Sequence, residues 1–167
     1  MIEFGHKGIG CICYLLAVFK KKFPYFRVSR QLIQKLLFIF AFLRRYEWGY
    51  CIKNSSGPHS DLVDFWLSWL ELREYARVEV KGVCKRYIFQ EALPEMMDKV
   101  DDGDKNLLQQ IVEKFGRCKL DELIIMTTVL YLRSRLDIDK KMLIDLMAEA
   151  RPDKTREQIK KIVERIL

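Results

Sequence analysis

The sequence is poor in the residues on which catalytic sites usually depend. Only two of its 167 residues are histidine, and neither His6 nor His59 has the partners of a nucleophilic or metal-binding motif. A glycine-rich phosphate loop is also missing, because Gly8-x-Gly10 lacks the third glycine and the preceding strand of a dinucleotide fingerprint. These absences predict a protein that is not an enzyme and that needs no cofactor.

Metal-binding and disulfide patterns are equally weak. The five cysteines are odd in number and mostly lie among apolar neighbours, which is typical of small buried thiols in a reducing cytoplasm. Cys11-x-Cys13 has neither the second pair nor the histidines of a structural zinc site. The segment 101–104 is similar to the start of a calcium loop, but Val112 stands where the loop needs a glutamate. We therefore predict no metal site.

No apolar run is long enough to cross a bilayer. The run from Gly8 to Phe19 is shorter than the roughly 20 residues that a transmembrane helix requires, and no small-residue cleavage site follows it. The next run, 32–43, is interrupted by Gln34 and Lys35. Half of the residues are apolar and 32% are charged, which is typical of a globular protein. The sequence predicts a cytoplasmic protein with two core helices here and no membrane partner.

Acidic residues are scarce in the first 60 positions. Ten Lys and Arg residues there face only Glu3 and Glu47, whereas the rest of the chain is nearly balanced within a formal net charge of +7. A basic half favours a polyanionic partner such as nucleic acid, although a solvated basic surface would have the same composition. The candidate nucleic-acid-binding residues are Lys20, Lys21, Lys22, Arg27, Arg30, Lys35, Arg77, Lys81, Lys85 and Arg86.

Periodicity and capping residues predict three helices followed by a hairpin. Helices are expected from about Gly8 to Lys22, from an N-cap at Ser29, and from an N-cap at Ser60 to about Tyr75. Two short strands are expected in 77–89, around a turn at Lys81-Gly82. The fold class is therefore mainly α with a small β-hairpin wing, and residues 1–92 are predicted to form a winged helix-turn-helix module.

Residues 93–167 are predicted to form a helical annex. Thr155 and Gln158 have the spacing of a capping box, and Gly116 is a candidate C-terminal cap. We expect the annex to pack on the module or to form a dimer contact, so a homodimer is one of the two alternatives. Its expected helices are 94–100, 104–115, 121–136, 140–149 and 155–166.

Three segments carry a resemblance to a known family: Arg30–Phe38, Gly49–Ile52 and Ser56–Ser60. Their pattern resembles the Panacea and YwgA-like proteins, with His59 where the family usually has tyrosine. The helix at 121–123 and the ending 151–167 are also similar. The resemblance implies a winged-helix-like fold without catalytic residues, and in the Panacea branch it implies antitoxins that neutralise toxins and sometimes act as degradation adaptors.

The expected solvent face of the third helix is acidic. At 100° per residue, the residues opposite its broad apolar face form one stripe with three acids and no base. Phosphate would repel this stripe, which disfavours insertion into a DNA groove. Two functions stay open: nucleic-acid binding, as in a regulator, through the basic wing and N-terminal helices, or protein interaction, as in an antitoxin or adaptor, through the stripe. The stripe consists of Asp61, Asp64, Ser68, Glu71 and Tyr75.

The spacing of Phe65, Trp66 and Trp69 predicts that these three side chains anchor the core. Replacing Trp66 by alanine should lower the free energy of unfolding by about 3 to 5 kcal/mol, because a large buried ring would leave a cavity. Chemical denaturation of the wild-type and Trp66→Ala proteins measures this difference. Unchanged melting of the variant would contradict the core assignment.

Overall fold

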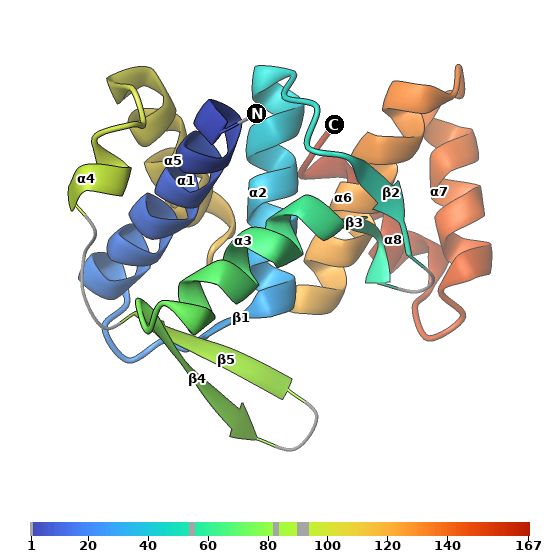
Figure 1. The fold of residues 1–167 in the computed structure, drawn as a ribbon. Helices are drawn as coiled ribbons and strands as arrows, with labels where there is room; N and C mark the ends of the chain where they lie inside the picture. Colours follow the sequence, from blue (N-terminus) through green and yellow to red (C-terminus); the bar gives the residue numbers. More distant parts are fainter. Residues whose placement is uncertain (1, 54–55, 82–83, 90–93) are drawn as a thin grey trace. The chain divides into compact units, whose positions relative to one another are not determined.

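The computed structural model describes the backbone of residues 2–53, 56–81, 84–89 and 94–167, and the side chains of 5–53, 56–79 and 94–167. The described chain is mainly helical with small antiparallel sheets, which confirms the predicted class at this level. It divides into two compact units (Figure 1). Unit 1 comprises Met1–Tyr50 and Ser60–Arg117, and unit 2 comprises Cys51–His59 and Cys118–Leu167.

Unit 1 contains three helices that lie above a small sheet in Figure 1. The strand order is β1-β5-β4, with antiparallel pairing of Val28 to Tyr87 and of Ala76 to Phe89. Two further helices follow the sheet, and both pack against α1. The elements are α1 (Ile2–Lys22), β1 (Val28–Ser29), α2 (Arg30–Arg44), α3 (Asp61–Leu72), β4 (Ala76–Lys81), β5 (Cys84–Phe89), α4 (Pro94–Met97) and α5 (Asp102–Phe115).

The predicted caps begin α2 and α3. The Ser29 hydroxyl accepts a hydrogen bond from the Leu32 amide at 3.1 Å, and the Ser60 hydroxyl accepts one from the Val63 amide at 3.2 Å. Each bond satisfies a backbone donor that has no partner within its helix. Two short strands that pair with each other lie between these helices in the chain, β2 (Tyr50–Ile52) and β3 (Pro58–Ser60).

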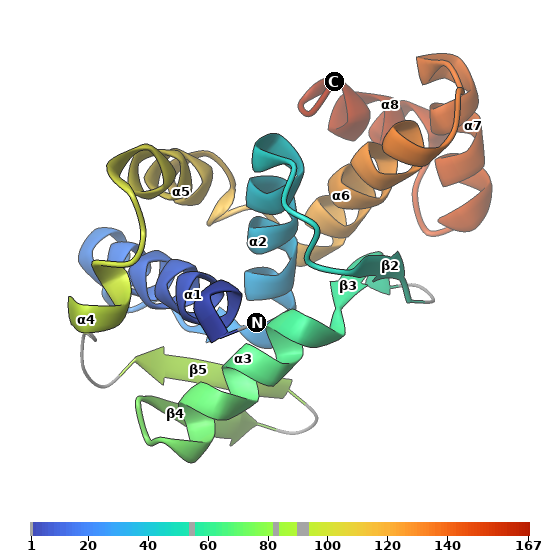
Figure 2. The same ribbon diagram turned by 45° about the horizontal axis from the view of Figure 1, so that its top comes forward.

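The close approach of α3 to α1 depends on a glycine. A Cβ atom at Gly8 would lie 2.3 Å from the Trp66 ring, so the ring fits only because Gly8 has no side chain. Trp66 also meets Trp48 edge-on, with ring centroids 5.2 Å apart. Figure 2 shows the ribbons of α1 and α3 close to each other near the start of α1. The burial of Trp66 confirms one predicted anchor and gives Gly8 a packing role.

A buried carboxylate joins three parts of unit 1. Asp104, near the start of α5, is buried, and its two oxygens lie 2.8 Å from Lys7 Nζ and 2.6 Å from Arg44 Nε. The Tyr46 hydroxyl donates to the same carboxylate at 2.9 Å. Burial opposes the charge of Lys7, but hydrogen bonds to Asp104, Tyr46 and Asp101 outweigh it and raise the Lys7 pKa. The cluster therefore ties α1 and the end of α2 to α5.

Unit 2 is built from α6 (Leu120–Arg135), α7 (Lys140–Ala150) and α8 (Arg156–Glu164), which pack on one another. The predicted capping box is present, with the Gln158 amide donating to the Thr155 hydroxyl and the Thr155 amide donating to the Gln158 side chain. Gly57, in the same unit, has φ +69°, and a Cβ there would lie 2.8 Å from Thr128 Oγ1. Glycine is thus required in this turn both by its dihedral angle and by the lack of space.

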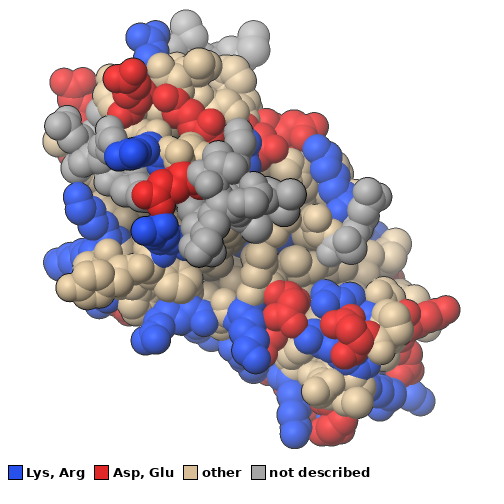
Figure 3. Space-filling view, turned by 90° about the horizontal axis from the view of Figure 1, so that it is seen from below, with Lys and Arg blue, Asp and Glu red and all other residues tan. Residues whose placement is uncertain are grey.

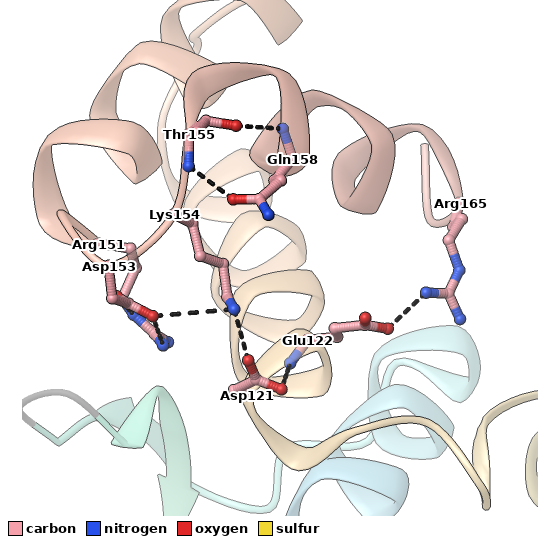
Figure 4. Close-up of polar contacts among 8 residues, drawn as sticks. All are labelled: Asp121, Glu122, Arg151, Asp153, Lys154, Thr155, Gln158 and Arg165. Atoms are coloured by element: carbon pink, nitrogen blue, oxygen red, sulfur yellow. Dashed lines mark hydrogen bonds and ion pairs between the residues drawn. The ribbon is translucent and has the colours of Figure 1, made fainter.

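Ion pairs connect the start of α6 to α8 and to the segment before it (Figure 4). Asp121 lies 2.6 Å from Lys154 Nζ, and Glu122 lies 2.6 Å from Arg165 Nη1. The hydrogen bond from Lys154 lowers the Asp121 pKa, even though burial acts in the opposite direction. Both carboxylates lie in the first turn of α6, where the helix dipole favours negative charge, and each also has a cationic partner.

The boundaries of the two compact units differ from the predicted division into a module of residues 1–92 and an annex of residues 93–167. α4 and α5 pack against α1 inside unit 1. The backbone of α4 comes so close to Gly10 that a Cβ atom at this position would lie 2.3 Å from Met96 O. Most predicted helix bounds agree with the structure within about two residues, but α1 begins earlier, at Ile2, and α3 ends earlier, at Leu72. None of the described helices combines the length and the apolar character that a membrane crossing requires.

Two glycines of α1 provide a matched stability test. Gly8→Ala should destabilise the protein by about 1 to 3 kcal/mol, because the new methyl group overlaps the buried Trp66 ring. Gly5→Ala should be neutral or stabilise by up to about 1 kcal/mol, because the nearest atom would lie 4.0 Å away and alanine favours a helix. Urea denaturation of both variants measures the difference. Equal stability of the two variants would contradict the packing of Trp66 against Gly8.

Candidate functional site

One predicted nucleic-acid-binding residue lies in the core. Lys35 is only 1% exposed within α2, so in this structure it does not present the surface charge that nucleic-acid binding was predicted to use. Burial lowers its pKa to about 8, because the charged ammonium loses solvation. Gln34 beside it is also buried, and its amide donates to Ser60 O at 2.9 Å and to Asp64 Oδ1 at 2.9 Å. Gln34 therefore faces the start of α3, and neither residue of the polar interruption faces solvent.

Arg30, a second predicted binding residue, holds α2 against α3. Its Nε lies 3.0 Å from Asp64 Oδ1, and its Nη2 donates to Asp64 O at 2.8 Å and to Ser68 Oγ at 2.9 Å. The guanidinium thus occupies two members of the predicted acidic stripe. Asp64 and Ser68 do not form part of a freely exposed acidic face, which corrects the predicted stripe.

Two further predicted cations are engaged within unit 1. Lys22 Nζ lies 2.6 Å from Glu113 Oε1, and Arg27 forms an ion pair with Glu79. Lys20, Lys21 and Arg77 are exposed. The remaining three candidates lie in β4 and β5, and their side chains are outside the described part of the structure: Lys81, Lys85 and Arg86.

The outward face of α3 is largely apolar. Leu72 is 83% exposed and Phe65 is 63% exposed, so the predicted core role of Phe65 is wrong. Leu62 is 41% exposed, and Trp69 is half-buried beside Tyr75, with ring centroids 5.9 Å apart. The residues that α3 buries are Val63, Trp66, Leu67 and Leu70. We call Leu62, Phe65 and Leu72 the α3 apolar row.

The helix is rotated from its expected orientation. At 100° per residue, the centre of its buried face lies roughly 60° from the centre of the broad apolar arc in the sequence. The rotation brings Asp64 toward Arg30 and leaves Phe65 in solvent. The arc is wider than a single buried face, so packing against α1 and α2 decides which half of it reaches the core.

Acidic side chains flank the α3 apolar row. Asp61 and Glu74 are exposed, Glu71 is half-buried, and Arg73 is the single cation of this stretch, stacked over the Trp69 ring at 5.7 Å. Glu74 has φ +59°, which turns the chain sharply from α3 toward β4. A pocket lies beside this turn and is lined by Glu71, Glu74, Ala76, Arg77 and Val78.

The side chains drawn in Figure 3 do not form a field of one sign. Both blue Lys and Arg atoms and red Asp and Glu atoms lie among neutral atoms on the described part of this face. This mixture agrees with the ion pairs of Lys22 and Arg27, in which formal positive charge is compensated locally. The net charge of +7 therefore overstates the attraction of this surface for phosphate.

No protein-family model matches the sequence, and no curated protein matches it. The resemblance to Panacea and YwgA-like proteins accordingly stays an expectation from the sequence.

The α3 apolar row was missed by sequence reasoning, although a signal for it was present. Eight apolar residues span more than half of the helix circumference, from Leu72 through Trp66 to Leu67, which is more than one buried face can hold. An excess of this kind indicates either a fully buried helix or a second apolar contact. Arg30 and Gln34 of α2 contact one side of α3 and so decide which of its apolar residues stay exposed, and these contacts are seen only in the tertiary structure.

The buried lysine predicts a pH-dependent stability. Between about pH 8 and pH 10.5 the unfolded chain binds more protons at Lys35 than the folded chain, so the free energy of unfolding should rise with pH by up to about 3 kcal/mol. Lys35→Met should lack this rise, because it removes the titrating group. Urea denaturation at pH 7.5, 9 and 10.5 measures both proteins. The same pH slope in the variant and the wild type would refute the assignment.

Proposed function

We propose that this chain is a non-enzymatic protein-binding module with a winged-helix fold, and that it binds its partner through the α3 apolar row. The fold proposal rests on the order of elements in unit 1, in which three helices precede the β4–β5 hairpin. β1 adds to the hairpin at β5, which fixes the hairpin beside the helices. The helix that would read a DNA groove in such a fold is α3.

One observation carries the function: α3 exposes large apolar side chains and contains no Lys or Arg from Asp61 to Leu72. A DNA groove is lined by phosphates and offers little to Phe65 and Leu72, whereas a protein partner can remove both from water. Aromatic anchors at the centre of an interface contribute much of the binding energy. The protein-interaction role is therefore better supported than groove reading, but through apolar residues rather than through the acidic stripe.

The partner is a protein segment with an apolar stripe and a basic rim. Three acidic residues at the two ends of α3, Asp61, Glu71 and Glu74, outnumber the exposed cations Arg73 and Arg77 there, so basic residues at the rim would be attracted. A second copy of this chain fits less well, because a two-fold contact would bring the same acidic rim against itself. An amphipathic helix with Lys or Arg beside its apolar residues has the required chemistry. This partner agrees with the antitoxin or adaptor role that the Panacea resemblance implies.

Selection of peptides on the purified full-length chain tests the proposal. Displayed peptides that bind should share apolar residues at helical spacing with flanking Lys or Arg. Phe65→Ser should then weaken the binding of a purified, labelled peptide by about 30-fold, because truncation of an anchor costs about 2 kcal/mol or more. Fluorescence anisotropy measures the dissociation constants.

Leu146→Ser in α7 is the matched control, because Leu146 is also an exposed apolar residue but lies in unit 2. This variant should bind the peptide as tightly as the wild type. Equal weakening by both variants, or no effect of Phe65→Ser, would refute the proposal. Sedimentation that shows a dimer in the wild type and a monomer in Phe65→Ser would instead assign the row to self-association.

A further inference from the structure

A tight turn after α1 presents one tyrosine entirely to solvent. The Phe26 amide donates to Phe23 O at 2.9 Å, which closes a turn with Pro24 and Tyr25 at its two central positions. Proline at the first of these positions fixes φ in the range that the turn needs. Tyr25 is 98% exposed, the highest value among the exposed large apolar and aromatic side chains of the described residues. Its ring is therefore held outward by a stiff backbone.

The residues on either side of Tyr25 anchor this turn to unit 1. The Phe26 ring stacks on Phe19 with centroids 5.7 Å apart and planes 18° apart, and Phe23 lies 6.0 Å from the same ring. Phe19 is buried and packs against Gly116, where a Cβ would lie 2.9 Å from the phenylalanine ring. Three phenylalanines thus support the turn. Phe26 is itself 41% exposed, whereas Tyr25 is exposed almost completely.

Cations lie at two helix ends close to the turn in sequence or in contact with one of its residues. Lys20, Lys21 and Lys22 form the last turn of α1, where the helix dipole favours positive charge. Arg117 follows α5 and lies over the Phe23 ring at 5.6 Å. The ion pair of Lys22 with Glu113 shows that the ends of α1 and α5 are neighbours. We call Lys20, Lys21, Tyr25 and Arg117 the Tyr25 surface.

We propose that the Tyr25 surface binds single-stranded nucleic acid, with a base stacked on Tyr25 and the neighbouring phosphates contacting Lys20, Lys21 and Arg117. Proteins that bind single strands combine a basic track with exposed aromatic rings, because every base offers a face for stacking. A duplex keeps its bases stacked on one another, so Tyr25 gains little from it. This surface is separate from the α3 apolar row, and the two proposals can fail independently.

An anionic membrane is the less suitable partner for the same residues. Interfacial binding depends on a broad apolar face, whereas here Phe23 and Phe26 pack on Phe19 and only Tyr25 projects fully. The flat ring of tyrosine on a stiff turn fits a base, and the cations beside it come from the ends of α1 and α5. Vesicles therefore serve as an opposing arm of the test.

Fluorescence anisotropy with labelled oligonucleotides of about 15 nucleotides tests the proposal on the full-length chain. Single strands of mixed sequence, as DNA and as RNA, should bind more tightly than the DNA duplex of the same sequence, and the tighter of the two identifies the natural ligand. Tyr25→Ser should weaken binding by about 5- to 100-fold, whereas Tyr25→Phe should retain it because the ring is kept. Thermal melting should be unchanged in both variants, since Tyr25 is outside the core.

Paired lysine substitutions separate local from general electrostatics. The double variant Lys20→Gln with Lys21→Gln should reduce the slope of log affinity against log salt by about 1.4, since each lost phosphate contact on a single strand changes it by about 0.7. The matched double variant Lys160→Gln with Lys161→Gln removes the same charge from exposed positions of α8 and should change the slope little.

Three results would overturn the proposal: no binding of single strands at low salt, equal affinities of wild-type and Tyr25→Ser proteins, or equal slope changes in the two lysine variants. Sedimentation with phosphatidylserine vesicles that depends on Tyr25, together with no binding of oligonucleotides, would assign the surface to a membrane instead. Phe65→Ser should bind the single strand as the wild type does, which keeps this proposal independent of the α3 apolar row.

Discussion

The contact between the Trp66 ring and Gly8 sets the orientation of α3 in unit 1. The ring lies where any side chain at position 8 would be, so the glycine allows α3 to approach α1 closely at this point. Trp48 closes the other side of the ring, and the Ser60 cap fixes where α3 begins. A helix whose start and whose buried ring are both fixed has one rotation about its axis. Every other residue of α3 takes its environment from that rotation.

The rotation determines the chemistry that α3 offers to a partner. Asp64 reaches Arg30, while Phe65 and Leu72 remain in solvent. Placing Phe65 in the core would require turning α3 about its axis and losing both the Arg30 contacts and the fit of Trp66 on Gly8. The stability of unit 1 is therefore linked to the exposure of an apolar row that a monomer has no need to expose. The protein partner that we propose would remove this row from water.

Many of the positive charges of unit 1 are compensated by neighbouring carboxylates or are buried. Lys7 and Arg44 meet at the buried Asp104, Lys22 meets Glu113, and Lys35 is enclosed by the core. These side chains contribute to the formal charge of +7 but not to a continuous basic field. Basic side chains gather beside Tyr25, at the ends of α1 and α5, where helix dipoles also favour them. A polyanion is therefore expected to bind at the ends of α1 and α5 rather than over the whole surface of unit 1.

The sequence by itself determined the elements. Ser29, Ser60 and Thr155 mark helix starts through bonds made within one turn, and the hairpin after α3 follows from local strand and turn preferences, so no distant residue is needed. Only the tertiary structure decided which faces are exposed. The burial of Lys35, the exposure of Phe65 and the pairing of Arg30 with Asp64 depend on contacts between α1, α2 and α3 that are distant in sequence. Periodicity gives the width of an apolar arc, but the neighbouring helices choose which part of it they cover.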